Sequence, residues 1–152
     1  MSQTLRKAGI VVHTDAAYDQ NKRIAAWGAF LESGMKNQKA RGVKPSTARD
    51  SSSAELFAAV QGINMALKLP VNCILLYTDS KYVQAALIER QVKPERGEDA
   101  AVLSGILSAI DARQITFTVR HVRAHTDNQS KPALRNRWCD AAARTALAEA
   151  LI

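Results

Sequence analysis

Residues 72–79 read NCILLYTD, a near-continuous apolar run that ends at the acidic residue Asp79. An apolar run of this length is typical of a strand in a parallel sheet whose two faces are both covered. Apolar residues also recur at helical spacing before and after it, in residues 54–69 and 98–112. The run therefore predicts a central strand of an α/β domain, with Asp79 at the carboxyl end of that strand.

Upstream of this run the pattern is that of β-strands. Residues 9–14 (GIVVHT) are rich in β-branched side chains and are followed by Asp15. Residues 25–33 (AAWGAFLES) read as a second strand across a polar turn, and a third strand is expected within residues 35–44. Three consecutive strands thus precede the first helical pattern.

Helices dominate the rest of the chain. The first is predicted over residues 54–69, with Glu55 in its first turn and N-caps offered by Ser51, Ser52 and Ser53. Further helices are expected over residues 80–90, 98–112 and 137–151, and a further strand over residues 115–122. Asp140 then falls in the first turn of the last helix. The order βββαβααβα predicts one α/β domain over residues 1–152, with a mixed five-stranded sheet flanked by helices.

The composition fits one folded domain with an anionic partner. The 152 residues are 47% apolar, which is enough for one core and argues against disorder. Lys and Arg number 21 against 14 acidic residues, a formal net charge of +7, so nucleic acid is the first candidate partner. We expect no signal peptide and no membrane span, because no apolar run is long enough. Two cysteines without zinc-site spacing suggest a reducing, cytoplasmic compartment.

Four acidic residues stand where a site is expected. Asp15 and Asp79 each follow a predicted strand, and ligands of open α/β sheets bind at that edge. Glu55 and Asp140 could complete a cluster from two helices. Taken singly, each acid is better explained by a turn, a helix cap or a helix dipole. Four close carboxylates repel one another, however, and together they imply Mg²⁺ or Mn²⁺ with oxygen ligands. Two such ions could clamp the attacking and leaving oxygens of a phosphodiester.

Four motifs, in this order along the chain, resemble those of the type 1 ribonucleases H. They are HTDAA, SSSAELFAAVQGI, LLYTDSKYV and RAHTDNQSKPALRNRWCDAAA, and the resemblance covers residues 9–148. It implies a ribonuclease H-like fold, with metal-binding carboxylates at Asp15, Glu55, Asp79 and Asp140. It further implies endonucleolytic cleavage of the RNA strand of an RNA/DNA hybrid, which leaves a 5′-phosphate and a 3′-hydroxyl.

The same resemblance assigns a catalytic role to His125, which matches the family's mobile-loop histidine. His125 lies in the polar stretch 124–136, where an imidazole could reach a leaving group and shuttle protons near neutral pH. Spacing alone favours a solvated loop histidine with no task. The motif around it favours the catalytic interpretation.

The sequence departs from the family pattern in four places. Ala16 and Ala17 replace the usual Gly and Ser after the first aspartate, and Lys81 replaces a Gln that follows the serine of the third motif. The basic, Trp-rich protrusion of some members is absent, since residues 90–99 read only RQVKPERGED. The segment between His125 and the last acid is longer than usual. These departures predict altered contacts with the nucleic acid.

Polar and basic residues around the four acids are expected to hold the hybrid. Runs of positive charge are usually solvated faces, but beside a carboxylate cluster they more plausibly bind phosphates. The candidates are Asn21, Ser51, Ser52, Ser80, Lys81, Lys39, Arg41 and Arg123. Two alternatives stay open: another nuclease of this fold that acts on DNA junctions, and a hybrid-binding module without catalysis. A monomer is expected.

Overall fold

The five predicted strands form one mixed sheet in the computed structural model, which describes residues 8–34, 36–123 and 130–152. Their order is β3-β2-β1-β4-β5, and β1 pairs antiparallel with β2 and parallel with β4. The strands are β1 (Gly9–Asp19), β2 (Ile24–Glu32), β3 (Asn37–Val43), β4 (Cys73–Thr78) and β5 (Thr116–His121). The predicted fold class and order of elements are confirmed.

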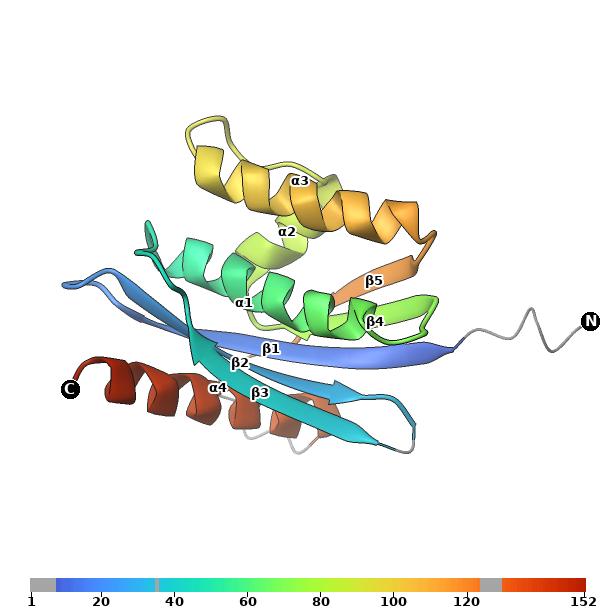
Figure 1. The fold of residues 1–152 in the computed structure, drawn as a ribbon, viewed down its shortest axis with the longest axis horizontal. Helices are drawn as coiled ribbons and strands as arrows, with labels where there is room; N and C mark the ends of the chain where they lie inside the picture. Colours follow the sequence, from blue (N-terminus) through green and yellow to red (C-terminus); the bar gives the residue numbers. More distant parts are fainter. Residues whose placement is uncertain (1–7, 35, 124–129) are drawn as a thin grey trace, which may run out of the picture.

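Helices cover both faces of this sheet. They are α1 (Ser51–Leu67), α2 (Lys81–Glu89), α3 (Gly97–Ala112) and α4 (Lys131–Ala150). Figure 1 shows α1, α2 and α3 on one side of the sheet and α4 on the other. Within the described ranges, no helix is both long and apolar enough to cross a membrane.

The main core lies between the sheet and the helices α1, α2 and α3. On β4, Ile74 and Leu76 are fully buried in this core, whereas Leu75 and Tyr77 on the opposite face are only half-buried. The sequence predicted a strand whose two faces are both covered. The difference arises because α4 packs mainly over β1, β2 and β3 and leaves much of β4 open on that side.

Two elements that carry predicted site residues extend further than expected. β1 runs four residues past Asp15, up to Asp19, because its hairpin with β2 supplies backbone partners to these more polar positions. α1 begins at Ser51 and is capped by Asp50, whose side chain accepts from the backbone N–H of Ser53. The serine caps were therefore predicted wrongly, and Glu55 lies in the second turn.

The largest boundary error concerns α4, which begins at Lys131 rather than at residue 137. Ser130 caps this helix, and Pro132 lies in the first turn, where a missing backbone N–H costs nothing. Asp140 consequently lies in the third turn, not the first. The second half of the stretch expected to be a polar loop is helical.

Two glycines let helices approach the sheet closely from its two sides. A Cβ atom at Gly62 of α1 would lie 2.5 Å from Cγ2 of Thr14, and one at Gly28 of β2 would lie 2.5 Å from the carbonyl oxygen of Cys139. The Sγ of Cys139 also donates to the carbonyl oxygen of His13, at 3.3 Å. Both helices are therefore seated directly against the centre of the sheet.

Gly28→Ala is expected to lower the free energy of unfolding by about 1–3 kcal/mol, because the new Cβ meets a backbone oxygen that moves only if α4 shifts. Urea unfolding measures this change. Gly105→Ala is the matched control, since Gly105 is an exposed position of α3 with no atom near its Cβ. It is expected to stabilise by up to about 1 kcal/mol through helix propensity. Unchanged stability of Gly28→Ala would contradict the close seating of α4.

Candidate active site

Asp15, Glu55 and Asp79 meet just beyond the parallel ladder between β1 and β4. The last pair of that ladder is His13–Tyr77, so Asp15 and Asp79, two residues further along, lie side by side. Glu55 joins them from the second turn of α1, and one oxygen of each carboxylate lies within 4.8 Å of the others. Three carboxylate oxygens at this spacing suit a hard divalent cation such as Mg²⁺ or Mn²⁺.

Burial and mutual repulsion shift the acid–base properties of this cluster. Burial, followed by the charge of Asp79, raises the pKa of Asp15 to about 8. Burial, followed by the charge of Asp15, raises the pKa of Glu55 well above its ordinary range. Burial also raises the pKa of Asp79, although contacts with the side chains of Asp15 and Asn136 oppose that rise. Without cations the cluster therefore retains protons that exposed carboxyl groups lose at neutral pH, and bound cations can take their place.

Asp140 lies at the border of this cluster. Its charge contributes to the raised pKa values of Asp15 and Asp79, so α4 does bring it near. Its own carboxylate pairs with Arg144 one turn further along, with Nε 3.2 Å away. The described residues thus group three of the four predicted acids, and the role of Asp140 as a metal ligand stays a prediction.

Two polar residues that the sequence did not assign also border Asp79. Asn136 is buried on α4, and its side chain lies close enough to Asp79 to lower the pKa of that carboxyl group. Its Nδ2 nevertheless makes no hydrogen bond of ordinary geometry with any described residue. His121 ends β5, and its Nε2 lies 3.0 Å from the carbonyl oxygen of Asp79. Because α4 begins at Lys131, Asn136 and Asp140 both lie on this helix, and their spacing of four residues places them on the same face. A correct prediction of the helix start would therefore have identified Asn136 as a neighbour of the site.

The predicted contacts at the start of α2 follow the cluster directly. Ser80 caps α2 by accepting from the backbone N–H of Val83, at 3.1 Å, and the exposed Lys81 is the first residue of the helix. A role of either residue in binding substrate stays a prediction.

A hollow of about 520 Å³ opens beside the start of α1. It lies between α1 and the turn that joins β1 to β2, and its lining includes Gln20, Arg23, Arg49 and Ser51. Asn21 is exposed in that turn, and Ser52 is half-buried in the first turn of α1. These predicted substrate contacts share the end of the sheet at which the carboxylates meet.

Lys39 and Arg41 lie on β3 and contact α4. The Nζ of Lys39 sits over aromatic rings of β2 and α4, 5.3 and 5.6 Å from their centres, and Arg41 pairs with Glu149 of α4 at 3.2 Å. Arg41, Gly28 and Asp15 are in register across three strands, and α4 is seated on Gly28. α4 therefore separates these two cations from the cluster. Their role in binding substrate stays a prediction.

Arg123 is exposed just after β5. His125 lies outside the described residues, so its catalytic role stays a prediction.

Comparison with known proteins adds a family to this geometry. The family model described as RNase H matches residues 7–148. A ribonuclease H of Rhodopseudomonas palustris strain TIE-1 is 36% identical over 75 residues, which are 49% of this chain and 46% of that protein. A ribonuclease H of strain HaA2 is 36% identical over 89 residues, 55% of this chain and 53% of that protein. The chain therefore matches about half the length of these curated relatives.

Solved structures share the fold at lower sequence identity. RNase H1 from the halophilic archaeon Halobacterium salinarum superposes with a TM-score of 0.68 at 22% identity, covering 93% of this chain and 98% of that one. LC11-RNase H1, solved in complex with an RNA/DNA hybrid, gives a TM-score of 0.64 at 15% identity, covering 91% and 99%. The sheet order and the helices on both its faces are thus those of a known architecture.

Proposed function

The chain belongs to the ribonuclease H family, and we propose that it hydrolyses the RNA strand of RNA/DNA hybrids at the cluster of Asp15, Glu55 and Asp79. The meeting of these three carboxylates carries the proposal, because their oxygens and raised pKa values suit divalent cations. Relatives named ribonuclease H and a structural neighbour solved with a hybrid support the choice of substrate.

Each of the five predicted catalytic residues has a defined role in this proposal. Asp15, Glu55 and Asp79 hold Mg²⁺ or Mn²⁺, and Asp140 completes the ligand set from α4. Two bound cations supply the positive charge that the attacking and leaving oxygens of a phosphodiester require. His125 passes a proton to the leaving oxygen. The products carry a 5′-phosphate and a 3′-hydroxyl.

The hybrid is held by positive charge and by polar groups around the cluster. The net charge of +7 attracts a polyanion, and the hollow with Arg23 and Arg49 in its lining opens beside α1. Recognition of the RNA strand requires contacts with 2′-hydroxyl groups, for which Asn21, Ser51 and Ser52 are the candidates. The two cysteines are free, which suits the cytoplasm, and we propose a monomer.

Cleavage of strand-labelled duplexes tests the proposal. With Mg²⁺, the chain is expected to cut the RNA strand of an RNA/DNA hybrid and to leave RNA/RNA, DNA/DNA and DNA junctions intact. Equal cleavage of DNA/DNA or preferential cleavage of junctions would support a different nuclease of this fold. Tight hybrid binding without any cleavage would support a binding module. Each of these results would overturn the proposed substrate or activity.

A further inference from the structure

An arginine at each end of α3 contacts the neighbouring end of α1. Arg96 is the N-cap residue of α3 and Arg113 its C-cap residue. Arg113 donates to carbonyl oxygens at and just beyond the C-terminal end of α1, those of Leu67, Leu69 and Val71. Arg96 reaches the opposite end of α1, where Asp50 caps the helix. Figure 1 shows the two helices side by side and running in the same direction.

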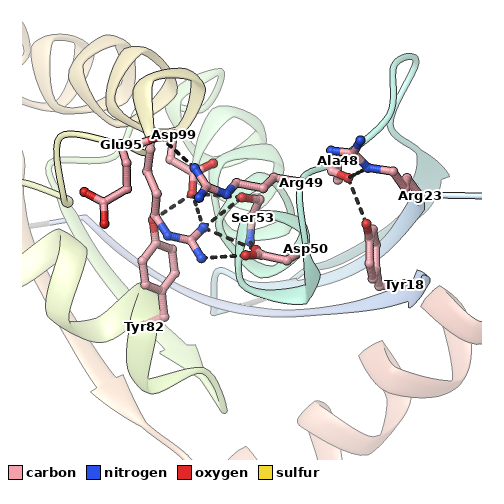
Figure 2. A network of polar contacts seen from close by, with 10 residues as sticks. Tyr18, Arg23, Ala48, Arg49, Asp50, Ser53, Tyr82, Glu95 and Asp99 are labelled. Carbon is pink, nitrogen blue, oxygen red and sulfur yellow. Dashed lines mark hydrogen bonds and ion pairs between the residues drawn. The ribbon is translucent and has the colours of Figure 1, made fainter. Parts of the chain in front are cut away.

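The guanidinium of Arg96 is the centre of a partly buried network of acids and hydroxyls. Figure 2 shows four members of this network, Asp50, Ser53, Tyr82 and Asp99. It forks onto Asp50, with Nη2 2.5 Å from Oδ2 and Nη1 3.2 Å from Oδ1. Nη1 also lies 3.1 Å from Oγ of Ser53 and 3.0 Å from Oδ2 of Asp99. The guanidinium carbon lies 4.8 Å from the ring centre of Tyr82. Only 17% of the Arg96 side chain is exposed.

Asp99 extends this network to a second helix of the active site. This aspartate of α3 is 6% exposed and accepts from the hydroxyl of Tyr82 at 2.7 Å and from that of Ser53 at 2.9 Å. Tyr82 belongs to the first turn of α2, and Ser53 to the first turn of α1. The network therefore ties together the first turns of α1, α2 and α3 (Figure 2).

Two of the three clustered carboxylates stand next to these tied turns. Glu55 follows Ser53 by two residues on α1, and Asp79 precedes Tyr82 by three residues at the start of α2. The first turn of a helix frays when its orphan N–H groups lose their cap, and Asp50 is the cap that Arg96 holds. Movement of either turn changes the distance between the two carboxylates.

We propose that Arg96 is a positioning residue which sets the separation of Glu55 and Asp79 for cation binding, by joining the first turns of α1 and α2. The inference rests on the proposed function, in which both carboxylates are metal ligands. A planar guanidinium is required here, because it contacts two carboxylates and a hydroxyl at once, whereas the ammonium of lysine is a point charge. Arg113 holds the far end of α1 and has no such task.

Mn²⁺ binding measured by titration calorimetry without nucleic acid tests this role. Arg96→Met and Arg113→Met form a matched pair, since each removes one guanidinium that joins α3 to one end of α1. Both variants are expected to melt at lower temperature, and binding is measured where circular dichroism shows them folded. Arg96→Met is expected to raise the Kd for Mn²⁺ about tenfold, and Arg113→Met less than about twofold. Arg96→Lys is expected to fall between the unaltered chain and Arg96→Met.

Equal Mn²⁺ affinity of Arg96→Met, Arg113→Met and the unaltered chain would overturn the proposal and leave Arg96 a structural clamp. If Arg96→Met fails to fold, Arg96→Lys decides, because it keeps the positive charge and removes the planar fork onto Asp50. A severalfold rise in its Kd is expected, and an unchanged Kd would overturn the proposal. Failure of the unaltered chain to bind Mn²⁺ would contradict the proposed function itself, so the two failures are distinguishable.

Discussion

Asp79→Asn is expected to abolish cleavage of the RNA strand, with a loss of roughly a thousandfold or more, because the amide replaces a metal-binding carboxylate. The same change removes one negative charge from a crowded cluster. The metal-free variant is therefore expected to melt at the same temperature as the unaltered chain or higher, and to gain less stability from Mg²⁺. Cleavage rates at saturating Mg²⁺ and thermal melts with chelator or excess Mg²⁺ measure both effects.

Asp111→Asn provides the matched control for this variant. Asp111 is an exposed residue of α3 that pairs with Arg90, so its replacement is expected to leave cleavage unchanged and to alter stability by less than about 1 kcal/mol. The proposed metal site would be contradicted if Asp79→Asn were active and the melting temperature of the unaltered chain did not change with Mg²⁺.

The second large effect is a loss of stability with rising pH in the metal-free protein. A carboxyl group with a higher pKa in the folded than in the unfolded chain stabilises the fold while it is protonated. For Asp15 this contribution is complete below the unfolded value of 3.8 and is lost as the pH rises through about 8. Urea unfolding with chelator, repeated from mildly acidic to mildly alkaline pH, is expected to show the decline.

Asp15→Asn and saturating Mg²⁺ are the two controls for this profile, and each is expected to flatten it. The comparison with Asp15→Asn is needed because burial lowers the pKa of His13, which adds stability as the pH rises through the unfolded value of 6.5. The difference between the unaltered chain and Asp15→Asn cancels the contribution of His13 and reports Asp15 together with its effect on the pKa of Glu55. A difference that does not change with pH would contradict the raised pKa of Asp15.

Periodicity in the sequence was sufficient for the order of elements but not for all of their ends. The apolar alternation and helical spacing that predicted five strands and four helices come from burial, which local sequence reports well. The start of α4 was missed because residues 131–136 (KPALRN) continue a polar stretch and contain too few apolar residues to show helical spacing. Their helical state depends on Ser130 and Pro132 and on packing against the sheet. The extension of β1 depends on pairing with β2, which its own residues do not reveal.

The candidate site, too, could be predicted only in part from local sequence. Asp15 and Asp79 could be placed together because each follows a predicted strand, and neighbouring parallel strands end at one edge. The Arg96–Asp50 pair joins residues 46 positions apart, and no local pattern marks such a partner. The pairing of Asp140 with Arg144 does have helical spacing, and both residues lie within the helix that the sequence predicted over residues 137–151.

Anomalous scattering from Mn²⁺, in crystals of the unaltered chain with a non-cleavable RNA/DNA hybrid, tests the central claim most directly. The account predicts two peaks within coordination distance of Asp15, Glu55 and Asp79, and their weakening or loss in Asp79→Asn. A map without a peak at these carboxylates, from a chain that cleaves the corresponding natural hybrid, would contradict it.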